Sequence, residues 1–217
     1  MPNSFSGESE LLSRREREKL AHRQAILDAA VRLFSEKGYF NTTLDEVAQR
    51  AEFSKGTLYL YFSSKEDMLF TIFHEEFIKW RNFITEITGK DMPFKDEVKE
   101  IFKIGAEYAY DDTFNFNINL LHRNPSIKAL SPVRVEELQK MHDELEHLSV
   151  LRIERAVEEG EIRAINARAL FGLLHGSLES IFETRWGTIS LDELKKAVDT
   201  IIDIIFNGIA KEREIAQ

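Results

Sequence analysis

Cysteine is absent from the sequence, which excludes a disulfide framework, thiolate chemistry and a cysteine-held metal site. A long apolar run is absent as well, since no stretch approaches the roughly 20 residues that a helix needs to span a bilayer. The N-terminal residues MPNSFSGESELL lack the basic and then apolar pattern of a signal peptide. We therefore expect a protein of the cytoplasm with no membrane partner.

Positive charge is in short supply, because 29 Lys and Arg stand against 38 Asp and Glu and leave a net charge of −9. Such an excess of acid by itself argues against a nucleic-acid-binding protein. The charge is unevenly distributed, however. Residues 1–65 hold 10 Lys and Arg against 9 Asp and Glu, whereas residues 66–217 hold 19 against 29. The N-terminal end can therefore approach phosphates, and the remainder is repelled by them.

Signals for β-strands, repeats and low-complexity segments are also missing. Apolar residues recur instead at helical spacing between breakers such as Gly38, Pro93 and Gly160. The predicted helices are one that Gly38 ends, one that begins at Leu44, and those over residues 55–61, 65–88, 95–112, 114–122, 132–159, 166–187 and 191–211. The sequence therefore predicts an all-α protein of about nine helices.

Residues 42–65, TTLDEVAQRAEFSKGTLYLYFSSK, are the most informative segment of the chain. Thr43 and Glu46 have the spacing of a capping box, which starts a helix at Leu44. Ser54 is a suitable N-cap for a second short helix, and Ser64 for a third helix. Two short helices joined by a tight turn are the arrangement with which a helix-turn-helix places one helix in the major groove of DNA.

The second helix of this segment is anchored by Leu58 and Phe62, which lie four residues apart. Its outward face then carries a lysine, a threonine, two tyrosines and a leucine: Lys55, Thr57, Tyr59, Leu60 and Tyr61. Lysine and tyrosine suit phosphate contacts, whereas threonine and leucine suit base edges and thymine methyl groups. The pattern alone leaves a second interpretation open, an ordinary helical hairpin in a core with its tyrosines packed.

Residues 26–70 resemble the N-terminal domain of TetR-family transcriptional regulators. The resemblance runs in one register through ILDAAVRLFSEKG, TTLDEVA and SKGTLYLYFSSKE. It implies a three-helix DNA-binding domain whose third helix reads an operator. By position, it implies DNA contacts from Thr43, Lys55, Gly56, Thr57, Tyr59, Leu60, Tyr61 and Lys65. One departure is Glu52 in the turn, where the family usually has Gly; a left-handed residue other than Gly costs about 1 kcal/mol.

With this resemblance, we divide the chain into an N-terminal arm over residues 1–19, a DNA-binding domain over 20–66, and an effector-binding and dimerisation domain over 67–217. The basic residues Arg14, Arg15, Arg17, Lys19 and Arg23 could reach adjacent phosphates or a minor groove. The alternative is a solvated helix start with charge pairs along the helix.

The last two predicted helices are strongly apolar, and residues 170–182 carry two glycines four positions apart. They present more apolar surface than a small bundle easily covers, which indicates a partner. The resemblance implies that these helices pair with those of a second copy. The expected homodimer interface contains Leu174, Leu178, Ile181, Leu194, Val198, Ile201, Ile202 and Ile205. A fully internal core is the alternative.

A small-molecule effector is expected in the middle of the chain, because sixteen Phe can line an apolar pocket. The candidate pocket residues are Phe77, Trp80, Phe102, Tyr108, Phe114, His122, Arg123, His175 and Phe182. Each of these side chains could instead belong to an ordinary core. An apolar or amphipathic effector would fit such a pocket.

Enzyme chemistry has no recognisable signal in the sequence, and we expect no catalytic residue, metal or cofactor. Glu144 and His147 form a lone Glu-x-x-His pair, whereas a di-iron site needs two such pairs. The favoured hypothesis is a ligand-responsive transcriptional regulator, a repressor that binds a near-palindromic operator as a homodimer. Two alternatives are a DNA-binding protein controlled by a protein partner, and a helical enzyme or carrier with a relic DNA-binding domain.

Overall fold

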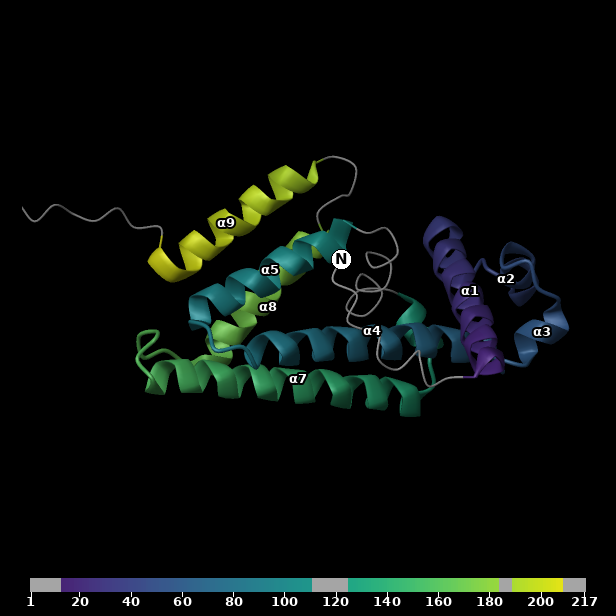
Figure 1. The fold of residues 1–217 in the computed structure, drawn as a ribbon, viewed down its shortest axis with the longest axis horizontal. Helices are drawn as coiled ribbons and strands as arrows, with labels where there is room; N and C mark the ends of the chain where they lie inside the picture. The colour runs from purple at the N-terminus through teal and green to yellow at the C-terminus, as the bar shows by residue number, and fades with distance from the viewer. Residues whose placement is uncertain (1–12, 111–124, 184–188, 209–217) are drawn as a thin grey trace, which may run out of the picture.

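A computed structural model describes residues 13–110, 125–183 and 189–208. Three helices, α1 (Arg14–Lys37), α2 (Leu44–Arg50) and α3 (Lys55–Tyr59), gather at one end of an elongated molecule (Figure 1). α4 (Lys65–Thr88) and α7 (Pro132–Glu158) run side by side along its length, and the short 3-10 helix η1 (Pro125–Ala129) precedes α7. α5 (Phe94–Tyr110), α8 (Ala167–Glu183) and α9 (Leu191–Asn207) form the other end. The predicted all-α class is confirmed.

Hydrogen-bonded caps explain where the N-terminal helices begin. Ser13 and Glu16 form a capping box, and Arg14 pairs with Glu18 at 2.9 Å, so α1 starts at Arg14. Residues 14–19, which we assigned to an arm, are therefore the first turns of α1. Thr43 forms the predicted capping box with Glu46 at the start of α2.

The turn between α2 and α3 contains Glu52 at the position where the family usually has Gly. Glu52 has φ of 60°, and it is the one non-glycine residue with positive φ among the described residues. α3 is shorter than predicted, because regular helix ends at Tyr59. Leu60 and Tyr61 continue as a hydrogen-bonded turn, in which the backbone N–H groups of Tyr61 and Phe62 both donate to the carbonyl of Leu58.

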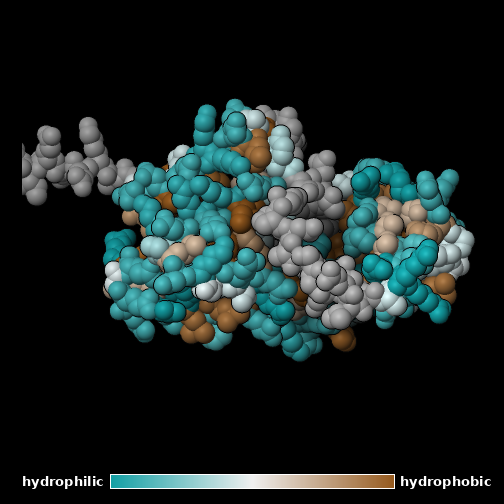
Figure 2. Space-filling model, in the orientation of Figure 1, coloured by the Kyte–Doolittle hydropathy of each residue, from teal (hydrophilic) through white to brown (hydrophobic). Residues whose placement is uncertain are grey.

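Two apolar cores run through the molecule. The first core is formed by residues of α1, α2, α3 and α4 together with Leu130 and Leu138. Because Leu138 belongs to α7, the N-terminal part of α7 packs directly onto the DNA-binding end. The second is built from α5, α7, α8 and α9. The face shown in Figure 2 is mostly hydrophilic with smaller apolar patches, because most apolar side chains lie in these two cores. No helix among the described residues is long and apolar enough to cross a membrane.

The structure corrects part of the expected dimer interface. The side chains of Ile181, Leu194, Val198 and Ile202 are buried inside the second core, where α9 packs against α5. They are therefore not on a surface that a second chain could contact. Ile201 and Ile205 are half-buried against the same core, and Leu174 and Leu178 line a cavity. The apolar face of α9 is satisfied largely by its own chain.

The outward faces of α8 and α9 carry a different set of residues. Leu173 and Ile204 are exposed there, and a Cβ built on Gly172 or Gly176 would meet nothing within 4 Å. Small exposed residues continue these faces: Ala169 and Ser180 on α8, and Ala197 and Thr200 on α9. The predicted helix over 114–122 and the C-terminal ends of the helices predicted over 95–112, 166–187 and 191–211 lie partly or wholly outside the described residues.

Candidate DNA-binding surface and effector cavity

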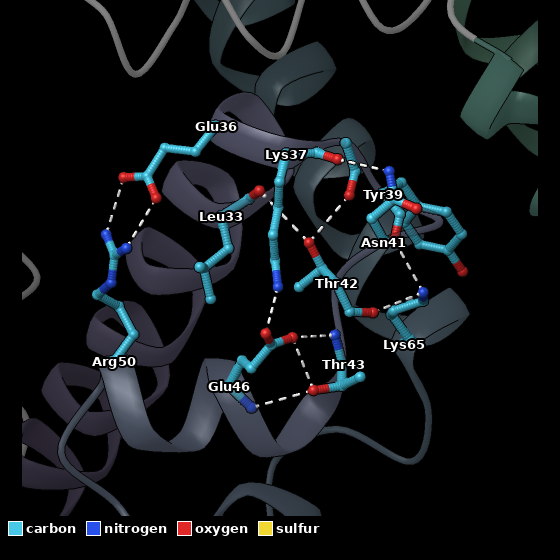
Figure 3. A network of polar contacts seen from close by, with 11 residues as sticks. Leu33, Glu36, Lys37, Tyr39, Asn41, Thr42, Thr43, Glu46, Arg50 and Lys65 are labelled. Atoms are coloured by element: carbon cyan, nitrogen blue, oxygen red, sulfur yellow. Dashed lines mark hydrogen bonds and ion pairs between the residues drawn. The ribbon is translucent and has the colours of Figure 1, made fainter.

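The helix-turn-helix rests on a network of polar contacts between α1, α2 and the connecting loop (Figure 3). Glu46 Oε2 accepts hydrogen bonds from the backbone N–H and the hydroxyl of Thr43, each at 2.8 Å. The other carboxylate oxygen of Glu46 pairs with Lys37 of α1. These hydrogen bonds, led by that from Lys37, lower the pKa of Glu46 to about 2. The carboxylate therefore stays ionised at neutral pH and ties the start of α2 to α1.

Lys65, in the first turn of α4, helps to hold the loop between α1 and α2. Lys65 Nζ donates to the backbone carbonyls of Tyr39 and Thr42, both at 2.8 Å, and lies 4.3 Å from the centre of the Tyr39 ring (Figure 3). Burial lowers the pKa of Lys65. The structure gives Lys65 a bracing role in the DNA-free protein, and the predicted phosphate contact stays a prediction.

The recognition surface predicted from the sequence lies together on one end of the molecule. Leu60 is 79% exposed and Tyr59 is 49% exposed. Both belong to the large apolar or aromatic side chains that the folded chain leaves exposed. The hydroxyl of Thr57 lies 2.8 Å from that of Ser54, which caps α3, and Gly56 lies in the first turn of that helix.

Tyr61 is positioned by a histidine that the sequence reasoning missed. The Tyr61 hydroxyl lies 3.4 Å from Nδ1 of His22 on α1, and the His22 ring lies 4.8 Å from the centre of the Phe53 ring. His22 thus packs between the turn of the motif and the recognition surface. No spacing rule could reveal this contact, because the two partners are 39 residues apart.

Lys55 is not free in the DNA-free protein. Its Nζ pairs with Asp45 Oδ1 of α2 at 2.6 Å, and this hydrogen bond raises the pKa of Lys55. Both side chains are more than half exposed, so the pair itself is weak. Asp45 therefore offsets the positive charge of Lys55 in the DNA-free protein, and at the predicted DNA-binding surface it would compete with phosphates for the ammonium group.

Asp45→Asn is expected to raise the affinity for random-sequence DNA about two- to fivefold at low salt and to steepen the salt dependence by about one phosphate contact, because it releases Lys55. The ratio of operator to random-sequence affinity should fall. Fluorescence anisotropy across a salt series measures both quantities. Asp199→Asn is the matched control, since Asp199 pairs with exposed Lys99 at the opposite end of the molecule. Equal random-sequence affinities for Asp45→Asn and the wild type would rule out this competition.

A cavity of about 160 Å³ lies between α4, α5, α7 and α8. Four of the predicted pocket residues line it: Phe77, Trp80, Phe102 and His175. The apolar wall is completed by residues that the sequence analysis did not single out: Ile84, Phe94, Val98, Ile101, Leu145, Ile153 and Phe171. Leu174 and Leu178, which we predicted at the dimer interface, also line the cavity. Tyr108 is not part of the lining and instead packs edge-on against Trp80. Phe114, His122 and Arg123, and the side chain of Phe182, lie outside the described residues.

The polar part of the cavity wall centres on a buried ion pair. Arg152 Nε donates to Glu97 Oε2 at 2.8 Å, and Arg152 Nη2 donates to Glu161 Oε1 at 3.1 Å. Burial raises the pKa of Glu97 despite its ion pair with Arg152. His142 and His175 add a second polar point, with their rings edge-on at 5.6 Å. An apolar cavity with a few polar groups is typical of a site for an amphipathic small molecule.

These features define a helix-turn-helix protein whose DNA-binding end is joined through α4 and α7 to a cavity-bearing helical end. The model of bacterial regulatory proteins of the tetR family matches residues 26–72. Residues 26–72 therefore form a DNA-binding domain of the tetR family type. The chain is a DNA-binding transcriptional regulator, and its relatives are regulators as well.

Three relatives illustrate how far the similarity extends. The fatty acid metabolism regulator protein of Bacillus subtilis (strain 168) is 25% identical over 191 residues, which cover 85% of this chain and 93% of that protein. The TetR family transcriptional regulator PfmR from Thermus thermophilus has a TM-score of 0.73 at 25% identity and covers 86% of this chain and 99% of its own. FadR from Bacillus subtilis, solved with stearoyl-CoA, has a TM-score of 0.68 at 20% identity, with 86% and 99% covered, and shows the shared fold.

Proposed function

We propose that this protein is a homodimeric repressor that binds a near-palindromic operator and is released from it by a small effector bound in the cavity between α4, α5, α7 and α8. Residues 20–66 serve DNA binding and residues 67–217 serve effector binding and dimerisation, with α4 crossing the boundary. A protein that binds an operator has to share a compartment with the DNA, which places it in the cytoplasm. The observation that carries the proposal is the exposed recognition surface on a domain that shares α4 with the cavity.

DNA binding through this surface accounts for the exposed apolar and aromatic side chains of α3 and its following turn. Tyr59 and Leu60 belong to neither core, and they lie beside Lys55 and Thr57. The N-terminus of α3 can approach phosphates while the outward side chains of α3 reach base edges. The acidic remainder of the chain is kept away from DNA by the length of the molecule.

A homodimer suits this DNA-binding mode, because two recognition helices about one helical turn apart read two half-sites of an operator. The outward faces of α8 and α9 are the surface we propose for pairing. Leu173 and Ile204 are exposed there, and the open space above Gly172 and Gly176 lets a second backbone approach closely. The buried side chains of α9 pack beneath this surface, inside the second core, and would not contact the second chain.

The effector class that we propose is an acyl-CoA. The cavity wall is predominantly apolar, and relatives include a fatty acid metabolism regulator and FadR, which was solved with stearoyl-CoA. A cavity of about 160 Å³ is comparable to an engineered cavity of about 150 Å³ that holds benzene. A short acyl chain therefore fits the cavity as it stands, whereas a long chain has to spread α4 and α7.

The deciding experiment measures operator affinity by anisotropy with and without butyryl-, octanoyl- and stearoyl-CoA, at fixed salt and with random-sequence competitor. The candidate operator is the DNA directly upstream of the gene. We expect at least one acyl-CoA to weaken operator binding about tenfold or more, and free CoA to leave it unchanged. The chain length with the largest effect reports how far the cavity opens.

Leu178→Trp is the matched cavity variant, because the indole would fill space that the acyl chain needs. It should bind operator as the wild type does and lose most of its acyl-CoA response. Operator binding that no acyl-CoA changes would reject this effector class. If Leu178→Trp and the wild type also had the same operator affinity with and without each acyl-CoA, control by a protein partner would become the better hypothesis.

A further inference from the structure

The first turn of α4 is held by α7 on one side of the helix. Asp67 Oδ1 accepts a hydrogen bond from Arg134 Nη2 at 2.8 Å, and Arg134 Nε lies 3.8 Å from Glu66 Oε1. The backbone N–H of Ser131, directly before α7, donates to the same Glu66 oxygen at 2.8 Å. The Arg134 guanidinium also lies 4.9 Å from the centre of the Phe70 ring. Both helices thus begin at one charged junction, in which the side chains of Arg134 and Asp67 are each 26% exposed.

The same turn of α4 is held on its other side by the DNA-binding domain. Lys65 immediately precedes Glu66 and donates to the carbonyls of Tyr39 and Thr42 in the loop before α2. The Thr42 hydroxyl in turn donates to the carbonyls of Gly38 and Leu33 at the end of α1. Three consecutive side chains of α4 therefore connect the loop that positions the helix-turn-helix with the start of α7.

Further along, α4 and α7 both contribute side chains to the cavity wall. Phe77 and Trp80 of α4 and His142 and Leu145 of α7 line it. At 1.5 Å per residue, Phe77 lies about 15 Å along α4 from Asp67, and His142 about 12 Å along α7 from Arg134. A ligand that spreads the two helices at the cavity consequently changes their angle at the junction, because helices of this length transmit displacement as rigid rods.

We propose that Arg134 is the positioning residue that fixes α4 to α7 in the operator-binding state, so that a ligand in the cavity acts on DNA binding by opening the Arg134–Asp67 contact. This inference rests on the proposed ligand-responsive function. The contact suits such a role, because a charge-assisted hydrogen bond is strong at 2.8 Å and weakens steeply with small changes in distance and angle. Coupling then arises from an interaction that exists in one state and is lost in the other.

The inference is tested with Arg134→Gln, Asp67→Asn and the double variant, which together form a mutant cycle. Arg134→Lys is the conservative variant that keeps the charge. Arg155→Gln is the matched control, since Arg155 lies on the same helix and its ion pair, with Glu159, stays at the far end of α7. Three readouts are taken on the full-length protein: amide hydrogen exchange in residues 39–43, operator affinity, and the ratio of operator affinities without and with octanoyl-CoA or stearoyl-CoA.

Arg134→Gln should speed amide exchange in residues 39–43 about tenfold, weaken operator binding about fivefold without ligand, and reduce the acyl-CoA response towards a ratio of one. Asp67→Asn should do the same, the double variant should add little, and Arg134→Lys should retain most of the wild-type response. Arg155→Gln should match the wild type in all three readouts.

The readouts separate two kinds of failure. A wild-type protein that binds operator but ignores acyl-CoA contradicts the proposed effector class, and the exchange and operator readouts still decide the role of Arg134. Unchanged exchange and unchanged operator affinity in folded Arg134→Gln would overturn the positioning role. Additive effects of the two single variants would overturn it too, because they would show that Arg134 and Asp67 act independently.

Discussion

Ile202→Asp is expected to unfold the cavity-bearing end of the protein. Ile202 is 3% exposed and packs inside the second core, where α9 meets α5. An aspartate there would bury an unpaired charge and remove apolar contacts, which together cost about 4 kcal/mol or more. That is a large part of the roughly 5–15 kcal/mol that stabilises a typical domain. Circular dichroism and calorimetry should show loss of the cooperative unfolding transition of this end of the protein.

Ile204→Asp is the matched control, on the same helix two residues further along. Ile204 is 44% exposed on the outward face of α9. Its replacement should leave the helical content and thermal unfolding of each chain nearly unchanged and shift the protein from dimer to monomer, measured by sedimentation velocity. A stable dimer of Ile202→Asp would show that the core assignment of α9 is wrong. A stable dimer of Ile204→Asp would remove the outward face of α9 from the proposed interface.

Tyr59→Ala should produce the largest loss of operator binding among single changes that preserve the fold. Tyr59 is exposed in the last turn of α3 beside Leu60 and makes no contribution to either core. A contact of this kind is worth about 1–2 kcal/mol in each half-site. Because a homodimer would lose it twice, we expect operator affinity to fall about 30- to 1,000-fold. Anisotropy against random-sequence competitor measures the loss.

Tyr110→Ala serves as the control for this prediction. Tyr110 is 48% exposed, almost as much as Tyr59, but it is the last residue of α5 and lies outside the DNA-binding domain. The Tyr110→Ala variant should bind operator as the wild type does. Thermal unfolding of both variants should remain close to that of the wild type. Wild-type operator affinity of Tyr59→Ala would mean that the recognition surface lies elsewhere on the DNA-binding end.

Local chemistry explains why the helix-turn-helix could be predicted from residues 42–65. The capping boxes and N-caps act over three residues, so Thr43 with Glu46 and Ser54 with Thr57 determine where α2 and α3 begin. The left-handed Glu52 lies where the family that the sequence resembles usually has glycine, so its conformation was expected from the resemblance and not from local chemistry. Exposure of Leu60 and Tyr59 follows from helical periodicity, because Leu58 has to face the core.

Long-range contacts decided what local chemistry could not. Periodicity showed that α9 has one broad apolar face, but it could not tell whether α5 or a second chain covers that face. Likewise, the sequence predicted that Lys55 and Lys65 contact DNA. In the folded chain Lys55 pairs with Asp45, and Lys65 donates hydrogen bonds to two backbone carbonyls. A side chain's partner depends on how distant segments pack, and that information is absent from its sequence neighbours.

The sequence by itself thus determined the all-α class, the position of the helix-turn-helix and the residues on its outward face, because caps, turns and periodicity operate within one or two helical turns. The tertiary structure alone decided which aromatic residues line the cavity, which face of α9 remains outward, and that Arg134 meets Asp67 across 67 positions of chain. Each of these depends on the crossing of helices whose relative placement is set by the packing of whole cores, and no local interaction specifies that placement.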